Sequence, residues 1–478
     1  MNKIKNLAGQ TAIYGVSSIV GRILNYLLVP LYTRAFITAE FGIITEMYAY
    51  VAFLIVILTY GMETAFFRFS QVDKKKNVYS TSLISLLGTS SLFIIIITFF
   101  SHDIANLLQY PNHSEYIIWL ALIVSLDALS SIPFAKLRAQ NKAKRFMVIK
   151  LINIAVNIGL NLYFYVDFHN WGLKQGVGVE YVFISNLISS IITVLLLLPE
   201  IIKTKYTFDF ELWKKMLVYA LPLLVAGLAG IINEAMDRIL LKYLLPKDIA
   251  MSQLGIYGAC YKISILMTIF IQAFRYAADP FFFSNAKEKN SKKLYADVMK
   301  YFVITVSFIF LGIMMYEDIV ILFIGEPFRV GAPVIPVLLL ANLFLGIYFN
   351  LSIWYKLTNK TLYGAYIAIF GATITLVLNF LLIPVIGYMG SAWATFICYA
   401  SMMIVSYLIG QKHFPVKYDF KRIIGYLCLS VSLFFISKLL NIETQNFRLI
   451  VNTVFIFIFI FVVIIVEKPQ FLKNKKVW

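Results

Sequence analysis

The chain has 478 residues, of which 60% are hydrophobic and only 14% are charged, and its mean hydropathy is +0.81. A soluble domain is nearer half apolar and about a quarter charged, so the composition excludes an ordinary soluble protein. The net charge of +18 would suggest nucleic acid in a soluble protein. Here the charges lie in short loops between apolar runs, where they orient helices and contact anionic membrane lipids. We therefore expect no nucleic-acid partner.

The cysteines and histidines indicate neither a metal site nor a nucleophilic catalyst. Cys260, Cys398 and Cys428 fall within apolar runs without metal-ligand spacing, and the four histidines fall in predicted loops far apart in the sequence. The N-terminus MNKIKNLAGQ is basic, and no small-residue cleavage site follows it. We interpret it as a retained cytoplasmic tail rather than a signal peptide. We expect no cofactor.

Apolar segments follow one another along the whole chain. Most contain about 20 residues or more, enough to cross a bilayer as a helix, and a helix is expected because lipid cannot satisfy backbone polar groups. The segments are 11–33, 41–67, 78–100, 115–135, 146–166, 178–199, 214–236, 254–281, 298–316, 334–355, 362–384, 389–409, 422–440 and 447–466. The sequence therefore predicts an all-α integral membrane protein with about 14 transmembrane helices. The loops are too short for a soluble domain.

The distribution of basic residues predicts the orientation. With a cytoplasmic N-terminus, 30 of the 42 Lys and Arg lie on the cytoplasmic side and eight on the opposite side. This asymmetry follows the positive-inside rule. If the number of helices were wrong by one, the basic loops after that point would change sides of the membrane. The asymmetry therefore also supports the number of helices. We expect a multi-pass protein of the bacterial cytoplasmic (inner) membrane with both termini in the cytoplasm. The remaining four basic residues lie within helices and are Arg22, Lys150, Lys262 and Arg275.

The chain partly repeats itself. Ala39-Glu40-Phe41-Gly42-Ile43 opens the second segment, and Ser252-Gln253-Leu254-Gly255-Ile256 opens the eighth. Chance similarity between apolar helices is the alternative explanation. A true repeat spans an even number of helices, so the two halves share one orientation, as in transporters whose two bundles rock about a central site. We predict a lobe at 1–200, a second six-helix lobe at 201–410, and a pair of C-terminal helices with a tail at 411–478.

Four stretches carry a resemblance to a known family. They are GQTAIYGVSSIVGRILNYLLVPLYTRAF near the N-terminus, AEFG, YGMETAFFRF, and LGIYGACYKIS in the eighth segment. With the helix layout, they make the chain similar to the polysaccharide-transporter branch (the O-antigen or Wzx type) of the MATE-like MOP flippase superfamily. The resemblance implies two pseudo-symmetric six-helix lobes plus two C-terminal helices. It also implies that undecaprenyl-diphosphate-linked oligosaccharide is moved from the cytoplasmic to the outer leaflet.

Three intramembrane cations are candidates for the diphosphate. Burying an unpaired anion is prohibitive, and Arg and Lys are the side chains that bind phosphate. In the lipid II flippases, cationic residues on helices 1 and 8 line the cavity, and Arg22, Lys262 and Arg275 lie on similar helices here. Lys262 and Arg275 point about 140° apart on a straight helix. Arg275 also has an alternative role, in which it reaches lipid phosphate at the cytoplasmic surface.

Acidic residues within the helices have two interpretations. Glu46 and Glu63 lie on the second segment and Asp127 on the fourth. They either line the cavity, where they couple transport to a cation or release the diphosphate, or form fixed structural pairs, for instance Glu46 or Glu63 with Arg22. Glu234 and Asp237, beside Arg238 at the end of the seventh segment, are expected near the surface with no special role.

Asparagines add a further polar stripe. Asn153, Asn157 and Asn161 recur every four residues on the fifth segment, and Asn25 shares a face with Arg22. They either line the cavity and bind sugar hydroxyls, or hydrogen-bond between packed helices. By resemblance to lipid II flippases, the last two helices either form a groove for the polyprenyl tail or pad the second lobe.

The sequence therefore predicts a flippase that works by alternating access in O-antigen or capsule biosynthesis, and no enzymatic activity. Its partners are a polyprenyl-diphosphate-linked oligosaccharide and membrane lipids, with the polysaccharide polymerase machinery as a further candidate. The alternatives are a lipid II flippase, a MATE-type drug or cation antiporter, and a polytopic glycosyltransferase or ligase. A glycosyltransferase would need a large external loop, which this sequence lacks.

Overall fold

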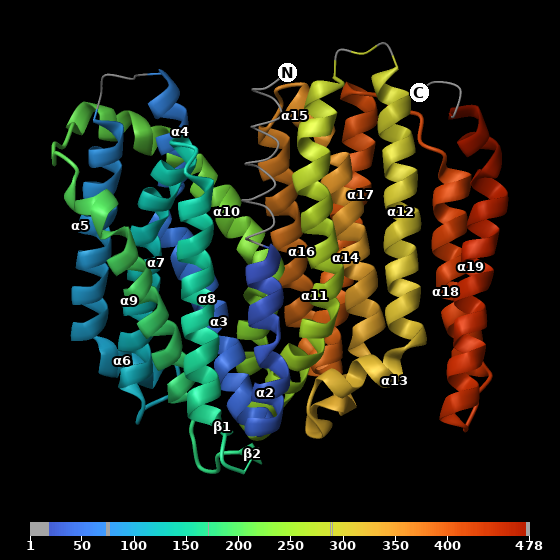
Figure 1. Ribbon diagram of the computed structural model, residues 1–478, viewed down its shortest axis with the longest axis horizontal. Coiled ribbons are helices and arrows are strands. Elements are labelled where there is room, and N and C mark those ends of the chain that lie inside the picture. Colours follow the sequence, from blue (N-terminus) through green and yellow to red (C-terminus); the bar gives the residue numbers. More distant parts are fainter. Residues whose placement is uncertain (1–18, 73–76, 171, 287, 289, 475–478) are drawn as a thin grey trace. The chain divides into compact units, whose positions relative to one another are not determined.

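The computed structural model describes residues 19–72, 77–170, 172–286, 288 and 290–474. These residues are almost all helical, with one short β-hairpin (Figure 1). Among them, 13 helical segments are long and apolar enough to cross a membrane. They coincide with the predicted segments from 41–67 to 447–466, so the prediction of an all-α, multi-pass membrane protein is confirmed. The first predicted segment, 11–33, lies partly outside the described residues.

The chain divides into two compact units, each described separately below. Unit 1 comprises residues 1–259 and 375–388, and unit 2 comprises residues 260–374 and 389–478. Two helices, α11 and α16, contribute to both units. The lobe boundaries expected from the sequence stay a prediction.

In unit 1, α7 packs against α5 and α9, and α8 packs against α9 (Figure 1). The antiparallel strands β1 and β2 form a hairpin between α8 and α9. The elements are α2 (Leu28–Ala35), α3 (Thr38–Thr59), α4 (Met62–Val72), α5 (Val78–Phe99), α6 (Ser101–Leu107), α7 (Ser114–Ala139), α8 (Ala143–Tyr165), β1 (Val166–Asp167), β2 (Gly172–Leu173), α9 (Glu180–Ile202), α10 (Phe210–Leu244), the start of α11 (Lys247–Ser284) and the end of α16 (Leu362–Ile386). Residues 19–26, before α2, are also helical.

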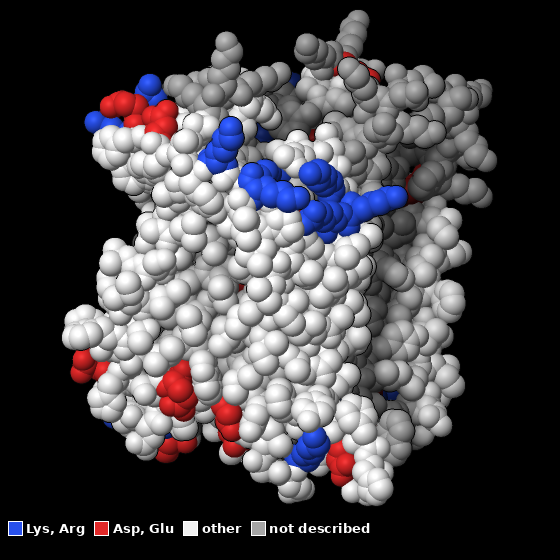
Figure 2. Space-filling model, turned by 60° about the vertical axis from the view of Figure 1, so that its left-hand side comes forward, with Lys and Arg blue, Asp and Glu red and all other residues white. Residues whose placement is uncertain are grey.

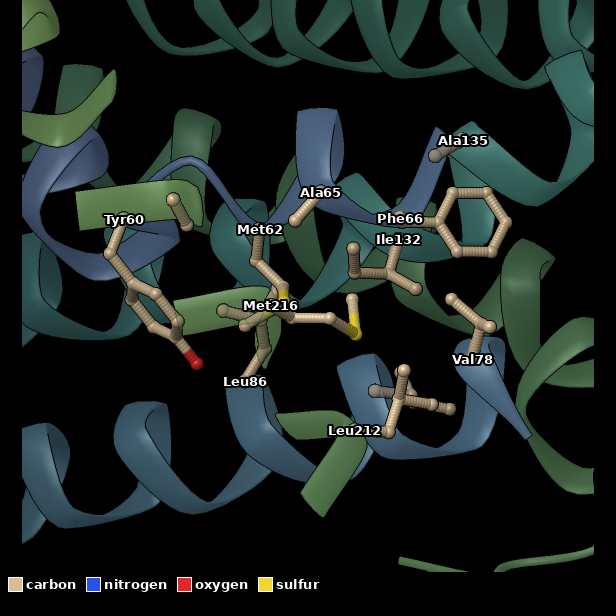
Figure 3. Packing of buried hydrophobic residues seen from close by; sticks show 12 residues of the cluster. Tyr60, Met62, Ala65, Phe66, Val78, Leu86, Ile132, Ala135, Leu212 and Met216 are labelled. Carbon is tan, nitrogen blue, oxygen red and sulfur yellow. The ribbon is translucent and has the colours of Figure 1, made fainter. Parts of the chain in front are cut away.

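The second predicted segment, 41–67, is not one continuous helix. It breaks into α3 and α4 at Tyr60 and Gly61, whose φ angles are +35° and +72°. Gly61 favours this left-handed conformation because it has no Cβ atom. A Cβ there would also lie 3.0 Å from the carbonyl oxygen of Ala220 in α10. The break directs α4 into a buried cluster that includes Met62 and Met216 and joins α4, α5, α7 and α10 (Figure 3).

In unit 2, α12 packs against α14, α18 and α19, and α18 runs beside α19 (Figure 1). Its elements are the remainder of α11 and of α16, α12 (Ser291–Met315), α13 (Glu317–Val320), the 3-10 helices η1 (Ile321–Phe323) and η2 (Glu326–Gly331), α14 (Val334–Leu351), α15 (Ile353–Leu357), α17 (Tyr388–His413), α18 (Phe420–Leu439) and α19 (Gln445–Asn474).

The same asparagine-containing turn ends a helix in each unit. Asn141 after α7 and Asn359 after α15 both adopt positive φ. In each turn the following lysine donates its backbone N–H to a carbonyl five residues earlier, from Lys142 to Leu137 (2.9 Å) and from Lys360 to Tyr355 (2.8 Å). This is the Schellman arrangement, in which asparagine is the usual substitute for glycine.

The exposed surface carries little charge over a broad band. On the face shown in Figure 2, Lys and Arg gather toward one end of the molecule, and mainly Asp and Glu appear at the other. The area between the two ends is uncharged. This pattern is expected of a surface that faces the hydrocarbon core of a bilayer.

Candidate functional site

Charged side chains are exposed at membrane depth in unit 1. Asp127 lies in α7, about 18 Å along the axis from its C-terminal end, and Lys150 lies in α8, about 10 Å from its start. Both side chains are exposed, and their charges interact. A charge at such depth normally faces water or protein rather than lipid. This part of unit 1 therefore has the character of a polar lining.

Helix α9 supports this lining through hydrogen bonds, and its Ser190 and Thr193 are themselves buried, at 2% and 4% exposed. The Ser190 hydroxyl donates to Asp127 Oδ1 (2.8 Å), and Asn186 Nδ2 donates to the Tyr48 hydroxyl of α3 (3.0 Å). One turn further on, Thr193 accepts from α8. The spacing of 186, 190 and 193 places these residues on one side of the helix. We call the set of Tyr48, Asp127, Lys150, Asn153, Asn186, Ser190 and Thr193 the polar track.

The asparagine stripe of α8 makes hydrogen bonds between helices. Asn153 Nδ2 donates to Thr193 Oγ1 (2.9 Å). Asn161 is fully buried, accepts from the Tyr32 hydroxyl of α2 (2.7 Å), and donates to the carbonyl of Asn157 (2.8 Å). The bonds to Thr193 and Tyr32 are of the kind that join packed membrane helices, whereas the bond from Asn161 to Asn157 lies within α8. The role of the stripe in lining a cavity stays a prediction.

Glu46 is the centre of a buried network. Its carboxylate is 0% exposed and accepts two hydrogen bonds of 2.9 Å from Lys242 Nζ of α10. The hydroxyls of Tyr50 and Tyr110 also donate to it. Burial, reinforced by the Glu46 carboxylate, raises the pKa of Tyr110 far above its ordinary value, so its phenol remains a donor. The extra hydrogen bonds help to offset the free-energy cost of removing the two charges of a buried pair from water.

Glu63 also has a basic partner, Arg138 of α7, whose Nη2 donates to its carboxylate. Both side chains are partly exposed, so the pair contributes little stability. The sequence had suggested Arg22 as the partner of Glu46 or Glu63, whereas the partners recorded in the structure are Lys242 and Arg138. Arg22 and Asn25 are exposed in the helical residues 19–26, and their roles in a cavity stay predictions.

Two expectations about the seventh helix were wrong. Helix α10 continues to Leu244, eight residues beyond the predicted end, so Lys242 is a buried helical residue rather than part of an external loop. Asp237 is 4% exposed and accepts from the Tyr257 hydroxyl of α11 (2.5 Å), so it does not lie at the surface. Both errors arise because a charged residue lowers local hydropathy and ends a predicted segment early.

The other two candidate cations lie in unit 2. Lys262 and Arg275 are both half-buried in α11. The guanidinium of Arg275 lies 3.9 Å from the centre of the Phe349 ring, which is a cation–π geometry. Because Arg22 belongs to unit 1, a joint site of the three cations stays a prediction.

Unit 2 also contains an apolar cavity of about 510 Å³. Helices α12, α14, α17 and α18 line it, and Lys438 and Glu317 lie at its edge with their charged groups 2.6 Å apart. The apolar lining includes Phe310, Leu340 and Trp393.

Comparison with known families identifies the chain. The model of the family described as "Polysaccharide biosynthesis protein" matches residues 31–333, which is more than half of the sequence. The chain belongs to this family. A comparison with curated proteins found no match.

Solved structures show which fold this family member has. The lipid II flippase MurJ, in an inward closed conformation, superimposes with a TM-score of 0.76 at 16% identity, covering 96% of this chain and 100% of that one. An inward-facing multidrug resistance MATE family transporter of the MOP superfamily gives 0.64 at 17% identity, covering 87% and 95%. An outward-facing one gives 0.58 at 14%, covering 88% and 96%. The MATE-like fold expected from the sequence is therefore confirmed.

Proposed function

We propose that this protein is a flippase for polyprenyl-diphosphate-linked oligosaccharide in surface polysaccharide (O-antigen or capsule) biosynthesis. The observation that carries the proposal is the polar track, with charges exposed at membrane depth, in a member of the polysaccharide biosynthesis protein family. A lipid-linked sugar needs such a lining because its headgroup has to cross the hydrocarbon region while its tail stays in lipid. No covalent bond changes, so transport requires no catalytic residue.

The diphosphate is assigned to the cations. Arg22 is exposed in unit 1, and its planar guanidinium can bind two phosphate oxygens at once. Lys262 and Arg275 would supply further positive charge from the second half of the protein. Arg275 is the weaker candidate of these because its guanidinium already lies against Phe349.

The sugar headgroup is assigned to the polar track. Hydroxyls of a sugar both donate and accept hydrogen bonds, and the exposed or half-buried members of the track offer a carboxylate, an ammonium group and amides. Asp127 and Lys150 are exposed and therefore accessible to a ligand. Asn25 lies on the same helical face as Arg22, three residues on, and is exposed with it.

The polyprenyl tail is assigned to the apolar cavity of unit 2. Its lining by α18 supports a binding role for the C-terminal helix pair rather than padding. The Lys438–Glu317 pair at the edge of the cavity would mark where the apolar lining ends. A bulky substitution at Val431, another lining residue, would fill the cavity.

A lipid II flippase is the second candidate, favoured by the fold likeness to MurJ over nearly the whole of both chains. A MATE-type antiporter shares the fold as well. The intramembrane cations argue against the antiporter, which would be expected to bind cationic drugs through acidic residues. We place the protein in the bacterial cytoplasmic membrane, where both lipid-linked substrates are made, with the polymerase machinery acting after it.

The deciding experiment is a gene deletion in the native host, followed by mass spectrometry of extracted lipids. We expect polyprenyl-diphosphate oligosaccharide to accumulate and the wild-type gene to remove it. Arg22→Ala should fail to do so, whereas Arg34→Ala, at the end of α2, is the matched control and should succeed. Accumulation of lipid II would favour the second candidate. Absence of either lipid, together with new sensitivity to cationic drugs, would favour the antiporter.

A further inference from the structure

The two copies of the internal repeat motif pack directly against each other within unit 1. Gly42 of α3 and Gly255 of α11 lie at the centre of this contact. A Cβ atom on Gly42 would lie 2.2 Å from the carbonyl oxygen of Met251, and one on Gly255 would lie 1.8 Å from that of Thr38. Both distances are far too short for any other residue. Glycine is therefore required for these two helices to approach so closely, as in other small-residue crossings of membrane helices.

The contact is reciprocal. Thr38 precedes Gly42 by four residues, and Met251 precedes Gly255 by four, so each glycine meets the carbonyl one turn before the other glycine. The hydroxyls of Thr38 and Ser252 complete it with a hydrogen bond of 2.7 Å. Such self-complementarity is the mark of a contact between symmetry-related surfaces. It supports the interpretation of the two motifs as a true repeat.

Neighbouring side chains strengthen the same contact. A Cβ on Gly258 would lie 2.6 Å from the Thr45 hydroxyl oxygen. The buried Glu46–Lys242 pair joins α3 to α10 in addition, and the hydroxyls of Tyr50 and Tyr243 lie 3.1 Å apart. Helices α10 and α11 are predicted to belong to the second lobe. Their contacts with α3 help to hold residues up to 259 in the compact unit 1.

We propose that the Gly42–Gly255 crossing closes the translocation route on the side that the loop charges assign to the cell exterior, and that it separates in every transport cycle. The inference rests on the proposed function and on the predicted orientation, in which α3 and α11 both begin on that side. Alternating access requires the two repeats to rock against each other. A contact that joins the repeats at one end has to break when that end opens.

The first test locks the crossing. Thr38→Cys and Ser252→Cys are combined in a full-length chain whose three native cysteines are replaced by alanine, and the gene complements the deletion strain. Because the two hydroxyls are in contact at 2.7 Å, we expect the sulfur atoms that replace them to meet closely enough for a disulfide. We expect oxidation to link the two helices, to stop transport, and to make lipid-linked oligosaccharide accumulate as in the deletion strain. Reductant should reverse the effect.

The matched control is a disulfide that joins two helices of the same C-terminal pair. Ser437 Oγ of α18 and Asn452 Oδ1 of α19 lie 2.5 Å apart, so Ser437→Cys with Asn452→Cys should also form a disulfide. This link should leave transport running. A Thr38–Ser252 disulfide that forms without stopping transport would overturn the inference, and so would its failure to form under conditions that link the control pair.

The second test does not depend on knowing the substrate. Gly255→Leu prevents the close approach and should hold the exterior side open. The readout is labelling of Ser252→Cys by a membrane-impermeant maleimide in intact cells. In the unaltered protein we expect the conformation open to the exterior to be a minor one, and such conformations are typically about 0.1–10% populated. Gly255→Leu should make it the major conformation, so we expect labelling to rise by about tenfold. Gly88→Leu, at a glycine of α5 with no neighbour near its Cβ position, should leave labelling unchanged.

The two tests separate this inference from the proposed function. If the deletion strain accumulates no lipid-linked oligosaccharide, the proposed function is wrong, and the maleimide labelling decides the inference by itself. Unchanged labelling of folded Gly255→Leu would refute the closure. If that variant does not fold, the cysteine pair, which keeps both glycines, gives the answer.

Discussion

At the scale of single residues, burial separates structural charges from the candidate site. Glu46 and Lys242 are 0% and 5% exposed and satisfy each other. Asp127 and Lys150 are exposed at membrane depth, so their charges remain available to a ligand. Exposure at this depth is costly unless water or a polar ligand is present. We therefore assign the first pair to stability and, under the proposed function, the second to transport.

Lys150→Met should impair transport without affecting the fold. The change removes an exposed ammonium group, and substitutions at exposed positions usually alter stability by less than about 0.5 kcal/mol. We expect slower clearance of lipid-linked oligosaccharide in the complemented deletion strain with an unchanged melting temperature in detergent. The control is Lys144→Met, at an exposed position in the first turn of the same helix, which should transport normally. Normal transport by Lys150→Met would remove Lys150 from the sugar site.

Lys242→Met should destabilise the protein strongly. It leaves the fully buried Glu46 carboxylate without its cation, and breaking a buried pair in this way costs about 3–5 kcal/mol. Thermal unfolding in detergent measures the effect. The double variant Glu46→Gln with Lys242→Met removes both charges and should recover most of the loss. A double variant no more stable than the single one would show that the pair is not the source of the effect.

At the scale of elements, the joints between helices depend on particular residues. Gly61 permits the break between α3 and α4, and Asn141 and Asn359 end helices in equivalent turns of the two units. The C-terminal pair α18 and α19 is held to α12 by the buried Glu467, which accepts from Lys300 Nζ (2.7 Å) and from Arg422 Nη1 (3.1 Å).

Gly61→Ala should lower stability by about 1–2 kcal/mol, the cost of a left-handed conformation for a residue with a Cβ atom. The contact with Ala220 adds to this cost. Gly88→Ala is the matched control, because this glycine of α5 has normal φ and open space at its Cβ position. It should be neutral or slightly stabilising. Equal melting temperatures for the two variants would mean that the α3–α4 break is not needed.

Glu467→Ala should loosen the C-terminal helix pair. Lys300 is 2% exposed and would lose its close carboxylate, keeping Asp297 at 3.9 Å. We therefore expect a loss of stability of up to about 3–5 kcal/mol, the cost of breaking a buried pair. Asp419→Ala instead removes a half-exposed partner of Arg422 and the N-cap of α18, and should cost less, about 1 kcal/mol. Limited proteolysis of the connection between α17 and α18 measures how readily the C-terminal helix pair detaches. Thermal unfolding measures the stability of the whole protein for comparison. Similar effects of the two substitutions would contradict the anchoring role of Glu467.

At the scale of the whole molecule, charge determines the expected orientation. The hairpin of β1 and β2 and the turn after α7 are separated by one span, α8, so they lie on opposite sides of the membrane. Asn170→Cys in the hairpin should react with a membrane-impermeant maleimide in intact cells. Asn141→Cys should react only after permeabilisation. Both belong in a background without the native cysteines, and the reverse result would invert the predicted orientation.

The sequence alone determined the order of the 13 membrane helices found among the described residues and the class of protein. Apolar runs of sufficient length can only form helices in lipid, so hydropathy identifies them with little help from packing. The repeat of Gly42 and Gly255 was also visible, because it is a pattern in the sequence itself. The prediction failed at the end of the seventh helix, where Asp237 and Lys242 lowered the local hydropathy and were assigned to the surface or to a loop.

The tertiary structure alone decided which charges meet. The Glu46–Lys242 and Lys300–Glu467 pairs join residues 196 and 167 positions apart, and no local signal links such partners. The same holds for the facing glycines, because a repeat shows that two segments are alike, not that they touch. A membrane helix forms because lipid offers its backbone polar groups no hydrogen-bond partners. Such a helix can therefore be predicted from the composition of the segment alone. Pairing across the fold depends on how the helices pack, and that appears only in three dimensions.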